Sequence, residues 1–264
     1  MLTYPEMNPI AFHIASWPVY WYGLMYLVGF LAGWGILSLR IQRSPSGFTQ
    51  DELSDIVFYA ALGAVLGGRI GYVIFYDWRM LFLDPLFIFQ TWKGGMSFHG
   101  GFLGVLVALA FGARKLHKPF FMLTDLLAPA APIGLAAGRI GNFINGELWG
   151  RITTMPWGMV FPQAGVNPRH PSQLYEFFLE GVVLFTILWI YSKKQRPLGA
   201  VSALFAICYS TFRIFAEFFR EPDAQIGFVA FGWMTEGQLL SIPLLLAGIL
   251  LFVFAYRPID ARKP

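Results

Sequence analysis

Apolar runs of membrane-spanning length are the feature of this sequence that most limits its fold. Seven such runs occur, at residues 17–39, 53–76, 97–113, 123–145, 172–191, 199–218 and 236–256. About 20 mostly apolar residues are what an α-helix needs to cross a hydrocarbon layer roughly 30 Å thick. A helix also pairs its backbone polar groups internally, as a bilayer requires. The runs therefore predict an all-α polytopic membrane protein with about seven transmembrane helices.

The composition agrees with a membrane protein. Hydrophobic residues make up 56% of the 264 residues and charged residues 13%, whereas soluble domains carry about 25% charged residues. We therefore expect residues 1–264 to form a single integral-membrane domain. The run at 85–92 is too short to span and is expected to lie along the interface. Residues 151–171 form the longest loop, on the outer side.

Cysteine and histidine usage limits the chemistry of the chain. The one cysteine, Cys208, rules out an internal disulfide, and no group of Cys and His has the spacing of metal ligands. Cys208 lies in an apolar run and is expected to be a small buried hydrophobe. We expect no metal and no dissociable cofactor.

Lysine and arginine residues are distributed unevenly between the two sets of loops, and short cytoplasmic loops are enriched in both. Of the nineteen, five lie on one side and three lie inside the spans. The other eleven share the second side: Arg40, Arg43, Arg114, Lys115, Lys118, Lys193, Lys194, Arg196, Arg257, Arg262 and Lys263. This asymmetry predicts an outer (periplasmic) N-terminus and a cytoplasmic C-terminus. Because the basic residues mark topology, the net charge of +4 does not indicate nucleic-acid binding.

Small residues and prolines predict how the helices pack. Glycines recur at every fourth position, which is typical of close helix contacts. They are Gly29 and Gly33 in the first run and Gly63, Gly67 and Gly71 in the second. Pro129 and Pro132 are expected to kink the run at 123–145, because proline cannot continue the helical hydrogen bonds.

Three arginines, Arg69, Arg139 and Arg213, lie inside the predicted spans. Placing each costs roughly 3 kcal/mol on insertion scales, so each must face a partner, a wet cavity or the head groups. Each lies roughly 21 to 24 Å along its helix from the cytoplasmic end, in the outer half of the membrane. A shared depth suits a cavity that holds a lipid phosphate, which guanidinium binds in a bidentate manner. A structural ion pair is the alternative for Arg69 and Arg213.

Other polar residues on the same spans are expected to join this layer. Tyr209 and Glu217 lie four residues before and after Arg213, so the three share a helix face and Arg213 can pair with Glu217. Asn142 lies three residues after Arg139 and shares its face. These residues predict a protein that handles phospholipid, with the reaction left open.

Two further spans bring polar residues to their outer ends. Tyr22 and Tyr26 share a face of the first span, and packing is the alternative role for Tyr26. His99 opens the third span, before two glycines that could let a head group approach the backbone. An interfacial anchor is the alternative for His99.

Several motifs along the chain resemble one known family. They occupy residues 21–26, 67–72, 96–101, 138–150, 169–176 and 212–223, of which 138–150 reads Gly-Arg-Ile-Gly-Asn-Phe-Ile-Asn-Gly-Glu-Leu-Trp-Gly. In this order they resemble the phosphatidylglycerol–prolipoprotein diacylglyceryl transferase family. The resemblance implies a multi-pass protein of the bacterial cytoplasmic (inner) membrane, with its active site towards the outer side.

The resemblance also implies a reaction and its partners. The sn-1,2-diacylglyceryl group of phosphatidylglycerol would pass to the lipobox cysteine thiol of a prolipoprotein, forming a thioether and releasing glycerol 1-phosphate. The nucleophile belongs to the substrate, so Cys208 is not required. Such a site must stabilise a departing phosphate and help to ionise a thiol.

The same resemblance implies a role for each site residue. Arg139 and Arg213 would hold the phosphate, and Asn142 and Tyr22 would position the head group. Glu147 and Glu217 would orient the arginines, and His99 would accept the thiol proton. The remaining lipid-binding residues are expected to be Gly150, Tyr209 and Arg69.

Two other classes of protein could use the same residues. A transporter or flippase would bind an anionic lipid without breaking a bond. A membrane phosphatase or acyltransferase would act on the same head group. No Gly-x-Ser-x-Gly or His-Glu-x-x-His motif occurs, which argues against hydrolases of those types.

The role of His99 is testable by substitution with a residue that does not titrate. If His99 accepts the thiol proton, His99→Gln membranes should transfer far less diacylglyceryl, because the ordinary histidine pKa of about 6.5 suits a general base. Turnover is measured from about pH 6 to about pH 9. Near-normal turnover over that range would exclude His99 as the base, and the arginines would then lower the thiol pKa enough for water to act.

Overall fold

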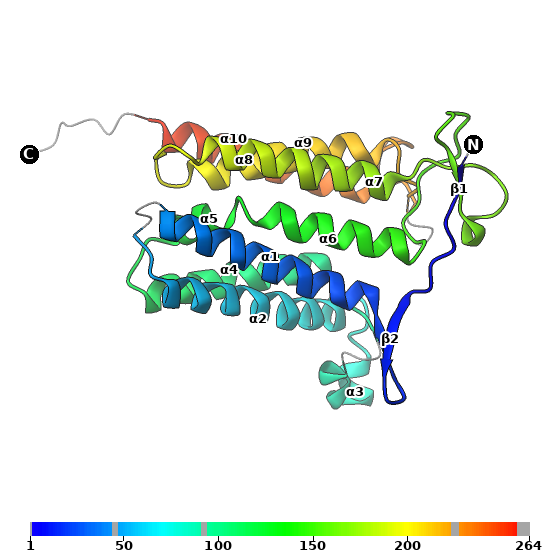
Figure 1. The fold of residues 1–264 in the computed structure, drawn as a ribbon, viewed down its shortest axis with the longest axis horizontal. Coiled ribbons are helices and arrows are strands. Elements are labelled where there is room, and N and C mark those ends of the chain that lie inside the picture. The colour runs from blue at the N-terminus through cyan, green and yellow to red at the C-terminus, as the bar shows by residue number, and fades with distance from the viewer. Residues whose placement is uncertain (1, 44–46, 91–93, 223–226, 258–264) are drawn as a thin grey trace, which may run out of the picture. The chain divides into compact units, whose positions relative to one another are not determined.

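The structure of the protein is a computed structural model, which describes residues 2–43, 47–90, 94–222 and 227–257 (Figure 1). Helices dominate. The longer ones are α1 (Trp21–Arg43), α2 (Gln50–Phe75), α4 (Phe98–Lys115), α6 (Ala131–Ile144), α9 (Ala200–Glu217) and α10 (Glu236–Ala255). The shorter ones are α3 (Met80–Leu83), η1 (Pro85–Phe89), α5 (Phe120–Leu127), η3 (Pro162–Ala164), α7 (Ser172–Glu176), the π-helical η4 (Phe177–Val183) and α8 (Leu184–Tyr191). Some predicted features lie outside the described residues: 91–92 of the interfacial run, Asp223, Lys93, Arg262 and Lys263.

The helices confirm an all-α polytopic membrane protein at the level of fold class. Among the described residues, five helices are long and apolar enough to cross a membrane: α1, α2, the continuous helix from α7 to α8, α9 and α10. A sixth is obtained if α5 and α6 are counted as one bent span. The expected span at 97–113 is the helix α4, but His99, Arg114 and Lys115 make it less apolar than the other five.

The start of the first predicted span was placed too early. Residues 17–20 form the strand β3 (Trp17–Tyr20), which pairs antiparallel with β2 (Ile10–Ile14), and α1 begins only at Trp21. The two strands turn at Ala15, whose φ is 54°. Trp21 N donates to the carbonyl of Pro9 at 2.9 Å, which joins the hairpin to the helix. The aromatic and β-branched residues before Trp21 therefore form a strand pair and not the first turns of a helix.

The predicted kink in the run at 123–145 is confirmed. The run divides into α5 and α6, with a break at residues 128–130. Pro129 lies in the break and Pro132 in the first turn of α6, where its missing N–H has no consequence for the helix. The expected short segment after Asp84 is also present, as the 3₁₀-helix η1.

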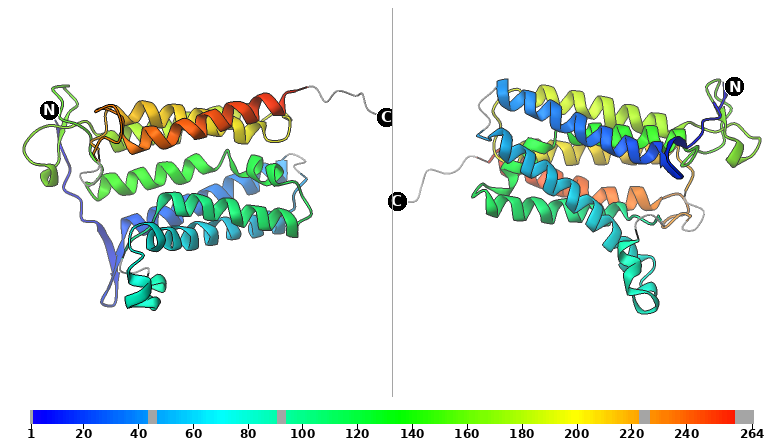
Figure 2. Two further views of the ribbon diagram at one scale, coloured as in Figure 1. Left: turned by 180° about the vertical axis from the view of Figure 1, so that it is seen from behind. Right: turned by 60° about the horizontal axis from the view of Figure 1, so that its bottom comes forward.

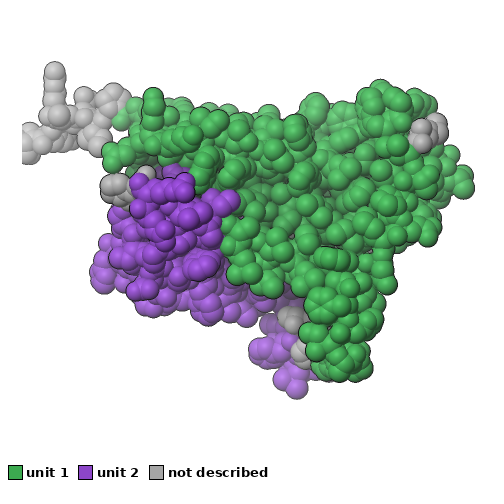
Figure 3. All heavy atoms as spheres, viewed as in Figure 1, with its two compact units in different colours: residues 1–33, 127–264 green, residues 34–126 purple. Residues whose placement is uncertain are grey.

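The chain divides into two compact units, which Figure 3 shows in different colours. One comprises residues 1–33 and 127–264, and the other comprises residues 34–126.

The smaller unit is held together by the contact of α2 with α4. Gly63, Gly67 and Gly71 of α2 face Gly100 and Gly104 of α4, as the spacing in α2 predicted. A Cβ on Gly63 would lie 2.5 Å from the Gly104 carbonyl oxygen, and one on Gly71 would lie 2.7 Å from Gly100 Cα. The backbones touch, so Gly100 serves helix packing and not the approach of a head group.

The larger unit is built from α6, the helix from α7 to α8, α9 and α10. The helices α9 and α10, coloured yellow-orange and red-orange, run side by side in Figure 2. Its apolar core gathers residues of α8 and α9, among them Leu184, Leu188 and Val201, with Cys208 packed against them as expected. The Gly29 of α1 packs on α6, where a Cβ would lie 3.0 Å from Gly134 Cα. Within this unit α6 therefore packs against α1 and against the helix from α7 to α8.

The loop at 151–171 is held by backbone pairing. Its strand β4 (Met159–Val160) pairs in parallel with β1 (Leu2–Thr3). Tyr4 follows β1, and its hydroxyl donates to the carbonyls of Phe143 and Ile144 at 2.6 and 2.8 Å. These bonds satisfy carbonyls at the end of α6 and fix the loop to that end.

The glycine contact of α2 and α4 makes a stability prediction. Gly104→Ala should lower the free energy of unfolding by about 1–3 kcal/mol, because the new methyl overlaps the Gly63 carbonyl. Gly35→Ala in α1 is the matched control, since a Cβ there meets nothing within 4 Å and alanine favours the helix by up to about 1 kcal/mol. The thermal midpoint of each purified variant is compared in detergent. Equal midpoints for the two variants would contradict this packing.

Candidate active site

Two arginines with little exposed surface meet two buried glutamates in the larger unit. Arg139 comes from α6 and Arg213 from α9, while Glu176 and Glu180 lie one turn apart in α7 and η4. Arg139 Nε lies 2.7 Å and Arg213 Nη1 lies 3.2 Å from the same oxygen, Glu176 Oε2. Arg139 Nη2 lies 3.2 Å from Glu180 Oε2, and Arg213 Nη1 lies 3.6 Å from Glu180 Oε1. Each glutamate therefore contacts both arginines.

Glu217 extends this cluster along α9. It pairs with Arg213 four residues earlier, as the sequence predicted, and also with Arg220 Nη1 at 3.2 Å. The Thr235 hydroxyl donates to its second oxygen at 2.7 Å. Gly237 makes room for the carboxylate, because a Cβ there would lie 2.6 Å from Glu217 Oε1. Glu217 is thus held from α9 and α10 and contacts Arg213 directly.

Glu147 and Asn142 form the next layer beside Arg139. Asn142 Nδ2 donates to Glu147 Oε1 at 2.9 Å, and Asn145 donates to the same oxygen at 3.3 Å. Asn142 Oδ1 in turn lies 3.5 Å from Arg139 Nη1, so the two share a face as expected. Gln173 donates to the Glu147 backbone carbonyl at 2.6 Å. Glu147 therefore contacts Asn142, and its link to Arg139 runs through that amide.

The tyrosines predicted for the site have different surroundings. The hydroxyls of Tyr22 and Tyr26 lie 3.1 Å apart on α1, and the Tyr22 ring fits against Gly141 of α6. Tyr26 is half exposed. Tyr209 is buried one turn before Arg213, and its ring stacks on Phe205 within the apolar core.

Gly150 lies where three backbone segments meet. Its N–H donates to the His170 carbonyl at 2.8 Å, and its own carbonyl accepts from Arg169 at 3.1 Å. A Cβ would lie 2.5 Å from the carbonyl oxygens of both His170 and Phe219. This position requires glycine because the backbone segments approach so closely.

His170 lies next to this contact, and its ring nitrogen is 2.9 Å from the Tyr175 hydroxyl. Burial of the His170 side chain lowers its pKa.

Arg69 and His99 belong to the smaller unit. Arg69 is buried, and its guanidinium donates to the backbone carbonyls of Phe87, Ile88, Gly94 and Gly95. It also lies over the Phe87 ring, 4.5 Å from the centroid. Arg69 therefore attaches η1 and the glycines Gly94 and Gly95 to α2. The His99 side chain is exposed in the first turn of α4, which Ser97 caps.

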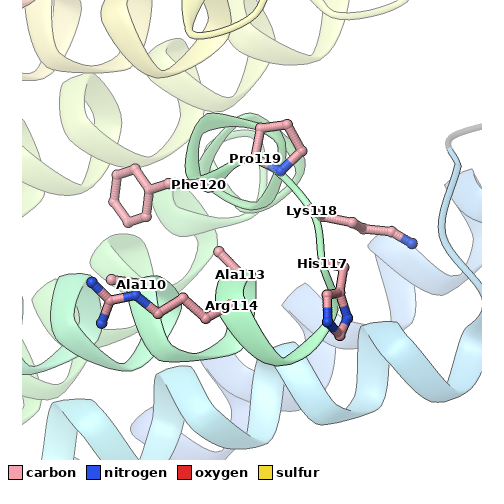
Figure 4. Close-up of a pocket in the computed structure, with 7 residues that line it drawn as sticks. All are labelled: Ala110, Ala113, Arg114, His117, Lys118, Pro119 and Phe120. Atoms are coloured by element: carbon pink, nitrogen blue, oxygen red, sulfur yellow. The ribbon is translucent and has the colours of Figure 1, made fainter.

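The smaller unit also holds a pocket of about 520 Å³ that contains none of the predicted site residues. It lies where α4 ends and α5 begins, and Figure 4 shows its side chains. Lys118 at its rim pairs with Glu52 at 2.5 Å. The lining residues are Ala110, Ala113, Arg114, His117, Lys118, Pro119 and Phe120.

Sequence reasoning did not assign Glu176 and Glu180 a role, although they are the partners of both arginines. A signal was present, because two acidic residues four apart in an apolar span cannot remain unpaired in a bilayer. Which arginine each would meet depends on contacts between helices, and no spacing within one helix gives those. Among the described residues, no three His, Cys, Asp or Glu residues are grouped as metal ligands.

Comparison with known proteins gives a match along nearly the whole chain. The model of the prolipoprotein diacylglyceryl transferase family matches residues 9–254. A protein of Coxiella burnetii (strain RSA 331 / Henzerling II) is 56% identical over 257 residues, covering 97% of this chain and 98% of its own. One of Pseudomonas paraeruginosa (strain DSM 24068 / PA7) is 54% identical over 264 residues, covering 100% and 99%. Both are named phosphatidylglycerol–prolipoprotein diacylglyceryl transferase.

Proposed function

The chain belongs to the prolipoprotein diacylglyceryl transferase family, and from this we propose that Arg139 and Arg213 hold the phosphate of its lipid substrate. The protein is an enzyme that transfers the diacylglyceryl group of phosphatidylglycerol to a prolipoprotein. The observation that carries this conclusion is the match over the full length of the chain. A transporter without covalent chemistry is correspondingly disfavoured.

The chemistry of the transfer explains why two arginines would be needed. The thiolate of the acceptor cysteine attacks the diacylglyceryl carbon, a C–S bond forms and the C–O bond to phosphate breaks. The bonding electrons pass to the phosphate oxygen, so a phosphodiester with one negative charge becomes a phosphomonoester that carries a second. Guanidinium groups fixed beside that oxygen stabilise the departing phosphate more strongly than they stabilise the phosphodiester of the bound lipid.

The surrounding residues receive roles that their contacts support. Tyr22, whose ring packs against Gly141 of α6, and Asn142 of α6 would position the glycerol head group. Glu217 would orient Arg213, and Glu147 would hold Asn142 in place. His99 is retained as the proposed acceptor of the thiol proton.

Three predicted residues fit supporting roles in this proposal. Arg69 would position η1 rather than bind lipid, because four backbone carbonyls already accept from its guanidinium. Tyr209 would close the site from the apolar core, below Arg213. Gly150 would act through the close approach of the strands around it.

The proposed arrangement in the membrane follows from the distribution of basic residues. Counting α4 and the bent pair α5 and α6 gives seven spans, with the N-terminus outside and the C-terminus in the cytoplasm. The loop at 151–171 is then on the outer side of the bacterial inner membrane. A prolipoprotein that has crossed the membrane would present its lipobox cysteine there.

Reconstitution tests the function directly. Purified protein is incubated in vesicles with phosphatidylglycerol and a lipobox peptide, and the products are separated by mass spectrometry. The transferase yields a thioether-linked peptide together with glycerol phosphate. A phosphatase would release lipid and leave the peptide unmodified, and a transporter would give no covalent product. Either of those two results would refute the proposal.

The bidentate role of Arg139 predicts the outcome of a conservative change. Arg139→Lys keeps the charge but loses the planar fork of donors, so turnover should fall about 100-fold or more. Arg79→Lys is the matched control, since Arg79 is exposed in the other unit. Turnover is measured per folded molecule in the reconstituted assay. Full activity of Arg139→Lys would show that a point charge is enough.

A further inference from the structure

We propose that Glu176 and Glu180 are positioning residues of the transfer reaction, which hold Arg139 and Arg213 as one pre-aligned pair. This inference rests on the proposed function and extends it to two side chains that the family's name and the sequence motifs leave without a role. It concerns side chains that act through the arginines rather than on the substrate.

The first support is the pattern of contacts. Glu176 uses a single oxygen to contact Arg139 Nε at 2.7 Å and Arg213 Nη1 at 3.2 Å. Glu180 contacts the same two arginines with different oxygens, at 3.2 and 3.6 Å. Two carboxylates thus bridge two guanidiniums that come from different helices. Neither arginine can rotate without breaking contacts to both carboxylates.

Burial shows which groups a lipid can reach. The side chains of Glu180 and Glu176 are 0% and 2% exposed, whereas those of Arg139 and Arg213 are 15% and 11% exposed. Of these four side chains, only the two arginines are therefore accessible to a ligand, and the carboxylates contact the arginines from the buried side. Within the part of the chain that the structure describes, the polar contact of Arg139 Nη1 is the one with Asn142 at 3.5 Å, so its N–H groups are available to a phosphate oxygen.

The charges of the cluster balance without a ligand. Arg139, Arg213 and Arg220 are formally balanced by Glu176, Glu180 and Glu217. Because the carboxylates neutralise the guanidiniums, the arginines should bind the singly charged phosphate of the lipid weakly. They should bind more strongly to the second negative charge that develops as the ester bond breaks. Removing one carboxylate should therefore strengthen binding of the lipid while loosening the alignment that the reaction needs.

Two local features indicate that this arrangement serves function and not stability alone. Glu180 lies in η4, and π-helical segments are frequent at functional sites. Glu176 Oε1 is buried without a hydrogen-bond partner among the described residues. Arg213 Nη1 and Glu180 Oε1 meet only as an ion pair, at 3.6 Å, and this contact lacks hydrogen-bond geometry. A cluster selected only for stability would be expected to satisfy these atoms.

Kinetics of isosteric variants test the proposal. Glu176→Gln and Glu180→Gln are reconstituted, and kcat and KM for phosphatidylglycerol are measured per folded molecule. We expect kcat to fall about 10- to 100-fold, because misalignment of about 1 Å has effects of that size, while KM stays equal or decreases. Glu221→Gln is the control, since Glu221 is half exposed and pairs with Arg169 outside the cluster; it should behave like the wild type.

A coupling measurement separates positioning from a structural role. Arg139→Lys is combined with Glu180→Gln, and its effect on kcat should be several-fold smaller than in the wild-type background if Glu180 acts through Arg139. Independent effects that simply multiply would contradict the proposal. A lower thermal midpoint with unchanged kcat would show that the glutamates only stabilise the fold, and would overturn it.

Two further arms keep the result interpretable. If a glutamine variant does not fold, the corresponding aspartate variant is measured, because it keeps the charge but withdraws the carboxylate by one methylene. A normal kcat for the folded aspartate variant would overturn the proposal, and a reduced kcat without a raised KM would support it. The wild-type protein must form the thioether in the same assay. Its failure would refute the proposed function, whereas normal variants beside an active wild type would refute this inference alone.

Discussion

The pairing of Arg139 and Arg213 with buried glutamates is the interaction on which the larger unit depends. Charges within a bilayer are costly, and removal of one partner of a buried pair typically destabilises by about 3–5 kcal/mol. The cluster joins α6, the helix from α7 to α8, α9 and, through Thr235, the start of α10. One set of contacts therefore fixes the helices and also holds the two guanidiniums that we propose bind the lipid phosphate. Under this proposal, the stability and the activity of the unit have the same physical origin.

The smaller unit solves a different problem with different residues. Apolar surfaces gain little by leaving lipid, so helices in a bilayer associate through close packing and hydrogen bonds. Glycines let α2 and α4 touch along their backbones, and Arg69 attaches η1 through carbonyls. The buried Arg69 is thus surrounded by backbone carbonyls, whereas Arg139 is surrounded by carboxylates. Arginines at similar predicted depth have different partners, and the partners decide their chemistry.

The sequence predicted what depends on neighbours along one helix. The apolar runs gave the helices, the prolines gave the break before α6, and the four-residue spacing gave the pair of Arg213 with Glu217. Spacing within one helix does not predict which residues of different helices contact one another. Glu176 meets both arginines only because three helices converge. The carbonyls around Arg69 belong to residues that follow it by 18 to 26 positions, in η1 and at Gly94 and Gly95. The hairpin before Trp21 was missed because its aromatic residues also suit the end of a span.

The most direct test compares the two environments of buried arginine. Arg213→Lys and Arg69→Lys are purified, and thioether formation from phosphatidylglycerol is measured per folded molecule. We expect Arg213→Lys to lose turnover at least about 100-fold, while the folded fraction of Arg69→Lys retains near-normal turnover and loses only stability. Retained turnover in Arg213→Lys together with lost turnover in folded Arg69→Lys would contradict this expectation.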